Sequence, residues 1–519
     1  RVHRASQRHG RGHLWTQPLH QRVQPGRLGH GSLARTHRLL GLARNSDLDP
    51  TRRSTPKLGG TTHLWQALGV VFFRRSPDGI GFRNFTPSQM EQALLLKQIR
   101  VLDPSSPWHG QIVDILMNQG QIVEVAPHLD APSAQVLEGQ GSVVSQGWVD
   151  GQVHFREPGE ETKEGLAHGL HVAAAAGMTQ VALLPSTHPP VDHAMAVESL
   201  LAKGAKVQTS GCPTAVLPMG CVTEQRQGQQ LAEMSDMAHH GAVAFTDDAP
   251  MDRVGALQRA LTYSRAHRKT VMDLPLETDL NHSGVMHEGV VSTEMGLLGI
   301  PVEAEVLRIS RDLEVLRHAG GQLHFSIVTA VQSLDLIREA KAGGLSVTCG
   351  TTAGHLVYTD EDLRGFHGTL KVRAPFRSAE DRKALRQGVL DGTVDMVVSD
   401  HRPEDLEHHD VEFVLSPNGM AGLSSAFALT LHGLAQETSQ DDAHAAAVRA
   451  WSSGPRQVLG LAEVPIAAGG PVNLTWHAPE AAHHVEVPTK AANTPPLPEG
   501  LTCAVRGVIH GTKHWLAQA

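Results

Sequence analysis

Short apolar runs alternate with helix-like stretches between residue 150 and about residue 445, and this rhythm restricts the fold more than any other feature. Runs that are continuously apolar and rich in β-branched residues are typical of strands in a parallel sheet that is covered by helices. The runs are TQVALLP (179–185), GAVAFTDD (241–248), KTVMDLP (269–275), QLHFSIV (322–328), LSVTCG (345–350) and DMVVSD (395–400). Roughly six to eight such units in about 300 residues predict an α/β fold, a (β/α)8 TIM-type barrel. An open doubly wound sheet is the alternative, but no G-x-G-x-x-G follows an early strand.

The segments on either side of this region have a different pattern. From residue 90 the runs ALLLKQIRVLD, GQIVDILMNQGQIVEVAP and GSVVSQGWVD predict short strands separated by turns. Near the end, WSSGPRQVLGL predicts a helix that stops at Gly460, and PVNLTWHAP, HHVEVPTKA and LTCAVRGVIHGTK predict further strands. We therefore expect a barrel over residues 147–445 and a small β-sandwich domain that combines residues 90–146 with residues 446–519.

The first 89 residues differ from the rest in charge. They carry 15 Lys and Arg against 3 Asp and Glu, whereas the other residues carry 30 against 50. They lack helical or strand periodicity and are poor in apolar residues, so folding could not offset the entropy of ordering them. We predict that residues 1–89 are disordered or a non-native extension, and that the patterned chain starts at Met90. A basic arm for nucleic acid is the alternative, but the acidic remainder opposes phosphate binding by the domain itself.

Cysteine usage and hydropathy indicate the compartment. The four cysteines are scattered and form no C-x-x-C pair, which argues against a disulfide framework and favours a reducing cytoplasm. No apolar run approaches the length that spans a bilayer, and the Arg- and His-rich start has no apolar core of a signal peptide. We expect a cytoplasmic protein without a membrane or nucleic-acid partner.

Polar side chains gather just after the predicted strands, where (β/α)8 barrels place their chemistry. They are Asp150, His154, Arg156, Asp247, Asp248, Asp400 and His401. Imidazoles and carboxylates that converge on an ion with an open position are what a metal hydrolase needs. Each of these residues also has a structural interpretation, since an aspartate after a strand often caps a turn. Most other histidines, such as His408 and His409, are expected on the solvated surface.

The segment GWVDGQVHFREPGEETKE (147–164) resembles the dihydroorotase signature G-[FW]-V-D-x-H-x-H-[FL]-R-E-P-G. Further segments match in the same order, among them LLPSTHPPVD (183–192), AFTDDAP (244–250), KVRAPFR (371–377) and DGTVDMVVSDHRPED (391–405). The likeness runs from about Met90 to the end of the chain. It implies an amidohydrolase barrel with zinc at its mouth and a role in pyrimidine synthesis.

The same resemblance implies that most metal ligands are lost. Three ligand positions are kept, namely His154, Asp247 and Asp400, and Asp400 is also the family's proton acceptor. Three positions where the family has histidine hold other residues, namely Gln152, Leu274 and Ser326. An amide is a weak ligand and leucine is none, so no cofactor is expected. His324 lies two residues before Ser326 on the same predicted strand, at a different depth.

The substrate positions of the family are altered as well. Arg156 matches the arginine that grips the substrate carboxylate, a task for which a guanidinium is suited. Ser186 and Arg373 stand where the family has asparagine, and Glu404 stands where it has histidine. Glu404 places negative charge where an anionic substrate would lie.

The resemblance therefore points to an inactive dihydroorotase-like chain. Chains of this class assemble with aspartate carbamoyltransferase as structural subunits, so we expect that partner and an oligomer. The alternative is an active dihydroorotase or another cyclic-amide hydrolase with a reduced mononuclear zinc site, with His154 as ligand and Asp400 as general base.

Overall fold

The computed structural model describes residues 88–90, 92–281 and 283–518. The extension expected over residues 1–89 lies outside the described residues, except for its last two positions. These form strand β1 (Ser88–Gln89), which pairs antiparallel with β19 (Lys513–Leu516). The folded part therefore begins at least two residues before Met90.

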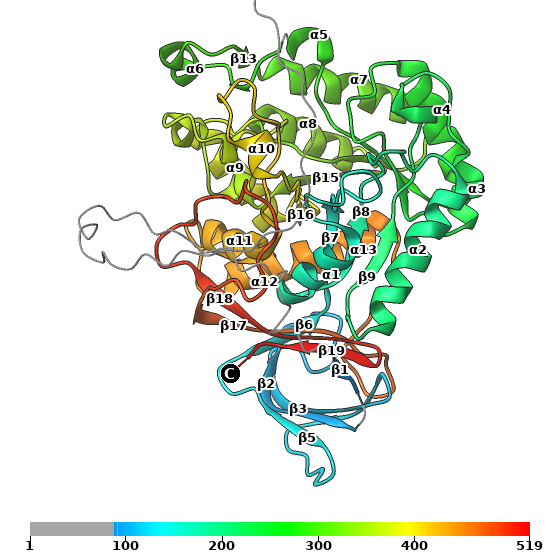
Figure 1. Cartoon of the computed structure of the whole chain (residues 1–519), viewed down its shortest axis with the longest axis vertical. Coiled ribbons are helices and arrows are strands. Elements are labelled where there is room, and N and C mark those ends of the chain that lie inside the picture. Colours follow the sequence, from blue (N-terminus) through cyan, green and yellow to red (C-terminus); the bar gives the residue numbers. More distant parts are fainter. Residues whose placement is uncertain (1–87, 91, 282, 519) are drawn as a thin grey trace, which may run out of the picture. The chain divides into compact units, whose positions relative to one another are not determined.

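A nine-stranded sheet combines strands from both flanking segments (Figure 1). Besides β1 and β19, its strands are β2 (Leu94–Val101), β3 (Ile112–Asn118), β4 (Gln121–Ala126), β5 (Gln135–Glu138), β6 (Val143–Gln146), β17 (Asn473–Ala482) and β18 (Thr502–His510). Their order is β1-β19-β18-β17-β6-β2-β3-β4, with β5 beside β2. Leu96, Ile99, Ile115 and Ile509 lie in the apolar core of this sheet.

One expected strand is wrong. HHVEVPTKA forms no strand, and residues 483–500 instead connect β17 to β18 as an irregular segment, which we name the 483–500 segment. Only His483 at its start still bonds beside β18, to the carbonyls of Leu501 and Cys503, whereas later residues bond to loops that follow other strands, as with Ala492 N–H to the carbonyl of Glu404 at 2.7 Å. Local β propensity is overridden here by these tertiary contacts.

Eight parallel strands form a second system. They are β7 (Trp148–Val153), β8 (Met178–Leu183), β9 (Ala215–Pro218), β10 (Ala244–Phe245), β11 (Thr270–Asp273), β14 (Leu323–Phe325), β15 (Val347–Thr352) and β16 (Met396–Val398). They pair as β7-β8-β9 and β10-β11-β14-β15-β16. Parallel bridges from Gly220 to Phe245 and from Val153 to His401 join the two groups at both ends. The strands thus follow one another around a closed path, the pairing expected for a (β/α)8 barrel; we call it the strand ring.

Helices follow most of the ring strands. They are α1 (Leu166–Ala175), α2 (Ala194–Thr209), α3 (Met234–His239), α4 (Val254–Ser264), α5 (Thr278–Asn281), α6 (Val290–Met295), α7 (Glu303–Ala319), α8 (Val331–Ala342), α9 (Ala379–Asp391), α10 (Leu406–His409), α11 (Ala426–Leu434), α12 (Gln440–Trp451) and α13 (Ser453–Leu459). A separate short pair joins β12 (Met286–His287) to β13 (Gly299–Ile300). The helix predicted to stop at Gly460 is confirmed as α13, and Gly460 has the left-handed φ of 64° that ends helices. The expected boundary at residue 445 falls inside α12.

The chain passes from the sheet into the ring at Gly147, between β6 and β7. A Cβ atom here would lie 2.0 Å from the side chain of Asn473 and 2.3 Å from that of Thr179, so only glycine fits. Trp148 follows, fully buried, and stacks on Phe427 of α11 with ring centroids 3.7 Å apart. No helix in the described part of the chain is long and apolar enough to cross a membrane.

Candidate functional site

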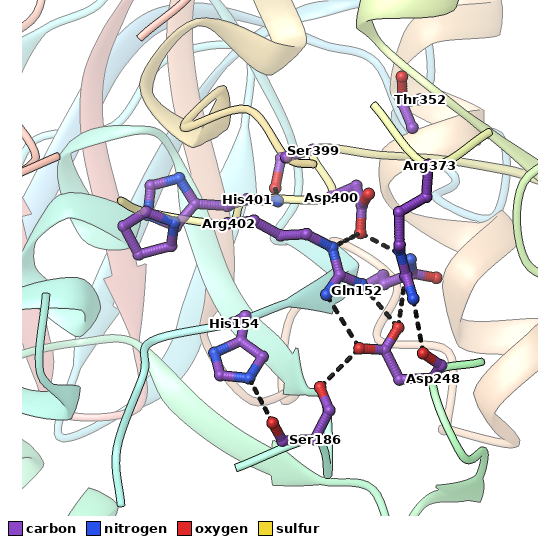
Figure 2. Close-up of polar contacts among 12 residues, drawn as sticks. Gln152, His154, Ser186, Asp248, Thr352, Arg373, Ser399, Asp400, His401 and Arg402 are labelled. Atoms are coloured by element: carbon purple, nitrogen blue, oxygen red, sulfur yellow. Dashed lines mark hydrogen bonds and ion pairs between the residues drawn. The ribbon is translucent and has the colours of Figure 1, made fainter. Parts of the chain in front are cut away.

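Polar side chains from distant parts of the chain meet at the carboxyl ends of the ring strands (Figure 2). We name this group the mouth cluster. Its members are Gln152, Ser186, Asp248, Arg373, Asp400 and Arg402. They lie in or after β7, β8, β10 and β16 and in the loop before α9, as expected for residues that line the mouth of such a ring.

Asp248 is the centre of the mouth cluster. Its two carboxylate oxygens accept hydrogen bonds from both terminal nitrogens of Arg402, at 2.9 and 2.6 Å. Arg373 donates to the same carboxylate at 2.6 Å, and the Ser186 hydroxyl donates at 2.5 Å. Burial alone would raise the pKa of the Asp248 carboxyl, but Arg373 and Arg402 hold that pKa well below its usual range. Asp248 is therefore ionised and fully engaged at neutral pH.

Asp400 is the second carboxylate of the cluster. Its Oδ1 accepts from the amide of Gln152 at 2.8 Å and from Nε of Arg402 at 2.9 Å. Arg402 thus bridges the two aspartates through one guanidinium. Asp248 and Asp400 both have a positive φ, 49° and 44°. Such backbone costs on the order of 1 kcal/mol for a non-glycine residue and persists where surrounding contacts hold it.

His154 lies beside the cluster with both ring nitrogens occupied. Its Nδ1 accepts the backbone N–H of Arg156 at 2.9 Å, so Nε2 carries the proton and donates it to the carbonyl of Ser186 at 3.1 Å. Burial, and after it the charges of Arg156 and Arg402, lower the pKa of His154 to about 3. The imidazole is neutral and offers no lone pair to a metal ion.

Asp247, which was expected among the metal ligands, has its carboxylate bonded to the loop after β9 instead of to the mouth cluster. Its carboxylate accepts the backbone N–H groups of Val222 and Thr223, both at 2.9 Å, and the Thr223 hydroxyl at 2.5 Å. It therefore fixes the loop after β9, in the turn-capping role that was the alternative interpretation. Its neighbour Asp248 is the residue that turns toward Asp400.

The two other lost ligand positions are filled by packing. Leu274 is buried against Ile327 and Ala374. Ser326 is buried, and its backbone N–H donates to the carbonyl of Asp273 at 2.8 Å. His324 lies in β14 and hydrogen-bonds to Thr348 at 2.8 Å rather than to any member of the mouth cluster.

A second ion-pair group holds the predicted substrate arginine. Arg156 pairs with Glu404 and, at 3.2 Å, with Glu160. Lys163 pairs with the same two carboxylates, at 2.7 Å for Glu404 and 2.6 Å for Glu160. Two cations and two anions neutralise one another, so the guanidinium of Arg156 already has its carboxylate partners.

These contacts do not fit a zinc centre. Zinc needs imidazole and carboxylate lone pairs that are free to converge on the ion. Here His154, Asp247 and Asp400 are bound by donors of the protein itself. Among the described residues, no three His, Cys, Asp or Glu side chains are grouped so that they could hold a metal ion.

Two residues that shape the mouth were missed by the sequence interpretation. Arg402 stands in SDHRPED where the family motif T-D-H-A-P-H has alanine, and that difference was the available signal. Asn493, in the 483–500 segment, donates to the carbonyls of Arg402 and Gly419, at 2.8 and 3.0 Å. Its Oδ1 accepts the N–H of Glu404 at 2.9 Å. Asn493 therefore fastens the loop that carries Arg402.

A family model described as Dihydro-orotase-like matches residues 141–333. The dihydroorotase of Pelotomaculum thermopropionicum is 36% identical over 408 residues, which covers 78% of this chain and 93% of that protein. The dihydroorotase of Anaeromyxobacter dehalogenans is 37% identical over 394 residues, covering 74% and 88%.

Solved structures with a similar fold are more distant in sequence. The L-hydantoinase (dihydropyrimidinase) of Arthrobacter aurescens has a TM-score of 0.67 at 20% identity, covering 80% of this chain and 94% of that chain. The D-hydantoinase of a Thermus species has a TM-score of 0.64 at 17% identity, covering 81% and 94%. At this identity the likeness concerns the fold alone.

Proposed function

Because the chain belongs to the dihydroorotase family, we propose that it is a non-catalytic member that serves pyrimidine synthesis as a structural subunit beside aspartate carbamoyltransferase. The observation that carries this proposal is that His154 and Asp400, two of the expected metal ligands, already have hydrogen-bond partners within the protein. A zinc-dependent hydrolase must lower the pKa of a bound water to about 7, which needs those groups free.

The proton-transfer side of the reaction is also compromised. Asp400 would be the general base, but its Oδ1 is held by Gln152 and by the cation of Arg402. Both hydrogen bonds are donated to the same oxygen, so the lone pairs of Oδ1 that would accept a proton are already occupied.

The substrate side supports the same conclusion. Dihydroorotate carries a carboxylate, for which Arg156 is the matching residue. That arginine is paired with Glu404, whose side chain is 4% exposed, so an anionic substrate would have to displace a buried carboxylate. The like charges would also repel each other.

The partner is proposed from the family likeness and from what the fold retains. The nine-stranded sheet and the strand ring keep packed cores while the site chemistry has changed. A chain whose shape is retained without its metal ligands fits a structural role in an assembly.

The first experiment measures metal and turnover on the purified full chain, with the Pelotomaculum thermopropionicum dihydroorotase as a parallel control. We expect much less than one zinc per chain and no dihydroorotate hydrolysis above buffer, whereas the control hydrolyses it. Two metal ions per chain with turnover would refute the proposal. One metal ion per chain with turnover would favour the mononuclear alternative.

The second experiment tests the partner. The chain and the aspartate carbamoyltransferase of the same host are mixed at micromolar concentration and analysed by size-exclusion chromatography with light scattering. We expect one co-eluting species. Separate elution at all ratios tested would rule out this partner. The non-catalytic assignment would then depend on the first experiment alone.

A further inference from the structure

We propose that Arg402 is the resident cation of the site: its guanidinium holds together Asp248 and Asp400 and thereby closes the mouth of the strand ring to divalent metal ions. One guanidinium forms a two-pronged pair with Asp248 at 2.9 and 2.6 Å and reaches Asp400 through Nε at 2.9 Å. The side chains of all three residues are at most 8% exposed. A planar, permanently charged fork suits this bridging task better than any other side chain.

The charge count at the mouth supports this role. Arg373 adds a second guanidinium, which donates to the Asp248 carboxylate and to its backbone carbonyl, both at 2.6 Å. Two guanidiniums thus face two carboxylates. A divalent ion that entered would bring two uncompensated positive charges into a buried space, which is strongly unfavourable.

Gln152 belongs to the same arrangement. In the family this position is a histidine ligand, whereas here the amide Nε2 donates to Oδ1 of Asp400 at 2.8 Å. A side chain that would accept a metal has become one that donates a hydrogen bond to a former metal ligand. The amide of Gln152 and the guanidinium of Arg402 therefore act together on the same oxygen of Asp400.

The position of Arg402 is fixed from outside the cluster. Its carbonyl accepts a hydrogen bond from Asn493, which is buried in the 483–500 segment. Its backbone N–H donates to the carbonyl of Met420 at 3.0 Å. The backbone is thus held from two sides, which fixes the position from which the guanidinium reaches the two aspartates.

This inference rests on the proposed function, in which the chain is non-catalytic. Its test does not depend on that function, because the experiments measure thermal stability and metal binding rather than turnover. The variant Arg402→Ala leaves two buried carboxylates with less compensation. We expect its Tm to fall by on the order of 5–10 °C. Millimolar ethylguanidinium should restore at least half of the loss, whereas ethylammonium, which has the charge but no planar fork, should restore little.

Arg226→Ala is the matched control. Arg226 lies next to the cluster, but its guanidinium binds the backbone carbonyls of Asp247 and Asp248, at 2.7 and 3.3 Å. Ethylguanidinium should leave this variant and the unchanged protein unaffected. An unaltered Tm for Arg402→Ala, or equal rescue of both variants, would overturn the proposal.

A second pair of variants measures metal binding. Gln152→His alone should show no detectable binding of Mn²⁺ or Zn²⁺ in a calorimetric titration, whereas Gln152→His combined with Arg402→Ala should bind the ion at least tenfold more tightly than the detection limit. Equal binding by both would show that Arg402 excludes nothing.

Should Arg402→Ala not fold, Arg402→Lys gives the answer. It keeps the charge and loses the fork, so we expect a lowered Tm. A Tm equal to that of the unchanged protein would mean that any cation suffices, against the assignment to a guanidinium bridge.

Discussion

Two buried regions at opposite ends of the strand β7 are filled in contrasting ways. At the start of β7, Trp148 stacks on Phe427 of α11, and His477 of β17 lies against both rings, with centroids 4.9 and 5.4 Å away. At its end, Gln152 joins the charged mouth cluster, where Arg402 bridges two aspartates. The first region is apolar packing, and the second is a closed network of ion pairs.

The two regions contribute to different properties: the aromatic region to the stability of the fold, and the mouth cluster to the choice of ligand. Apolar contact between sheet and ring is nondirectional and gains free energy in proportion to the area buried. A buried ion-pair network gains little over apolar packing, but it is costly to break because each lost partner leaves a charge uncompensated. The aromatic region should therefore dominate the free energy of unfolding, while the mouth cluster determines which ligands can enter.

The largest effect is expected at the aromatic region. Trp148→Ala removes a fully buried indole that stacks on Phe427 and donates to Ser145 at 3.0 Å. We expect a loss of about 4 kcal/mol in the free energy of unfolding, measured by urea denaturation.

Trp148→Phe is the control for this prediction, since it keeps a stacked ring and should lose about half as much. Similar losses for the two variants would mean that the indole hydrogen bond, rather than the aromatic packing, stabilises the join between sheet and ring.

An intermediate effect is expected where the 483–500 segment fastens the mouth. Asn493→Ala leaves the carbonyls of Arg402 and Gly419 and the N–H of Glu404 without their buried partner. We expect a loss of about 2–3 kcal/mol in the same denaturation experiment.

Hydrogen exchange followed by mass spectrometry shows where the loss acts. Faster exchange should be confined to residues 402–421 and to the 483–500 segment, while the nine-stranded sheet stays protected. Uniformly faster exchange would contradict the view that Asn493 acts on the mouth alone.

The smallest expected effect is a difference between the two regions in how their contribution to the free energy of unfolding depends on pH. Burial, and after it the charge of Arg100, lower the pKa of His444, which pairs with His477 in the aromatic region, to about 4. The unfolded chain takes up this proton near pH 6.5, so stability is constant above that pH and falls as the pH drops from 6.5 toward 4. Asp248 also loses its contribution on acidification but at a lower pH, because its lowered pKa preserves that contribution until the pH falls below about 4.

His444→Gln should therefore reduce the stability lost between pH 7 and pH 5 by about 2 kcal/mol. Arg402→Ala, at the mouth, should leave that loss unchanged. Urea denaturation at the two pH values measures both, and an unaltered pH dependence in His444→Gln would place the acid-sensitive groups elsewhere.

Much of the architecture was accessible from the sequence. All six apolar runs that were expected as ring strands contain one, because continuous apolar character marks strands buried on both faces. The strand β9 escaped notice because AVLP is only four residues long and ends in proline. The strand β7 was merged with β6, since Gly147 divides them without breaking the apolar pattern.

The candidate site was accessible only in part. The motifs alone led to the prediction that Gln152, Leu274 and Ser326 stand where the family has histidine, because the ability to bind a metal depends on side-chain chemistry. The sequence does not show which of Asp247 and Asp248 joins the mouth cluster, because the left-handed backbone of Asp248, in the turn after β10, decides this. HHVEVPTKA has strand-like composition, yet it forms no strand, and Thr489 and Lys490 bond to Glu164 in the loop after β7.

The sequence by itself determined the alternation of strand and helix and membership of the family, because these depend on local pattern and residue type. Only the tertiary structure decided that Arg402 joins Asp248, 154 residues away, and Asp400 in one pair network. Electrostatic partners are chosen by distance and burial in space, and closing the strand ring brings together charges that nothing in their local sequence relates.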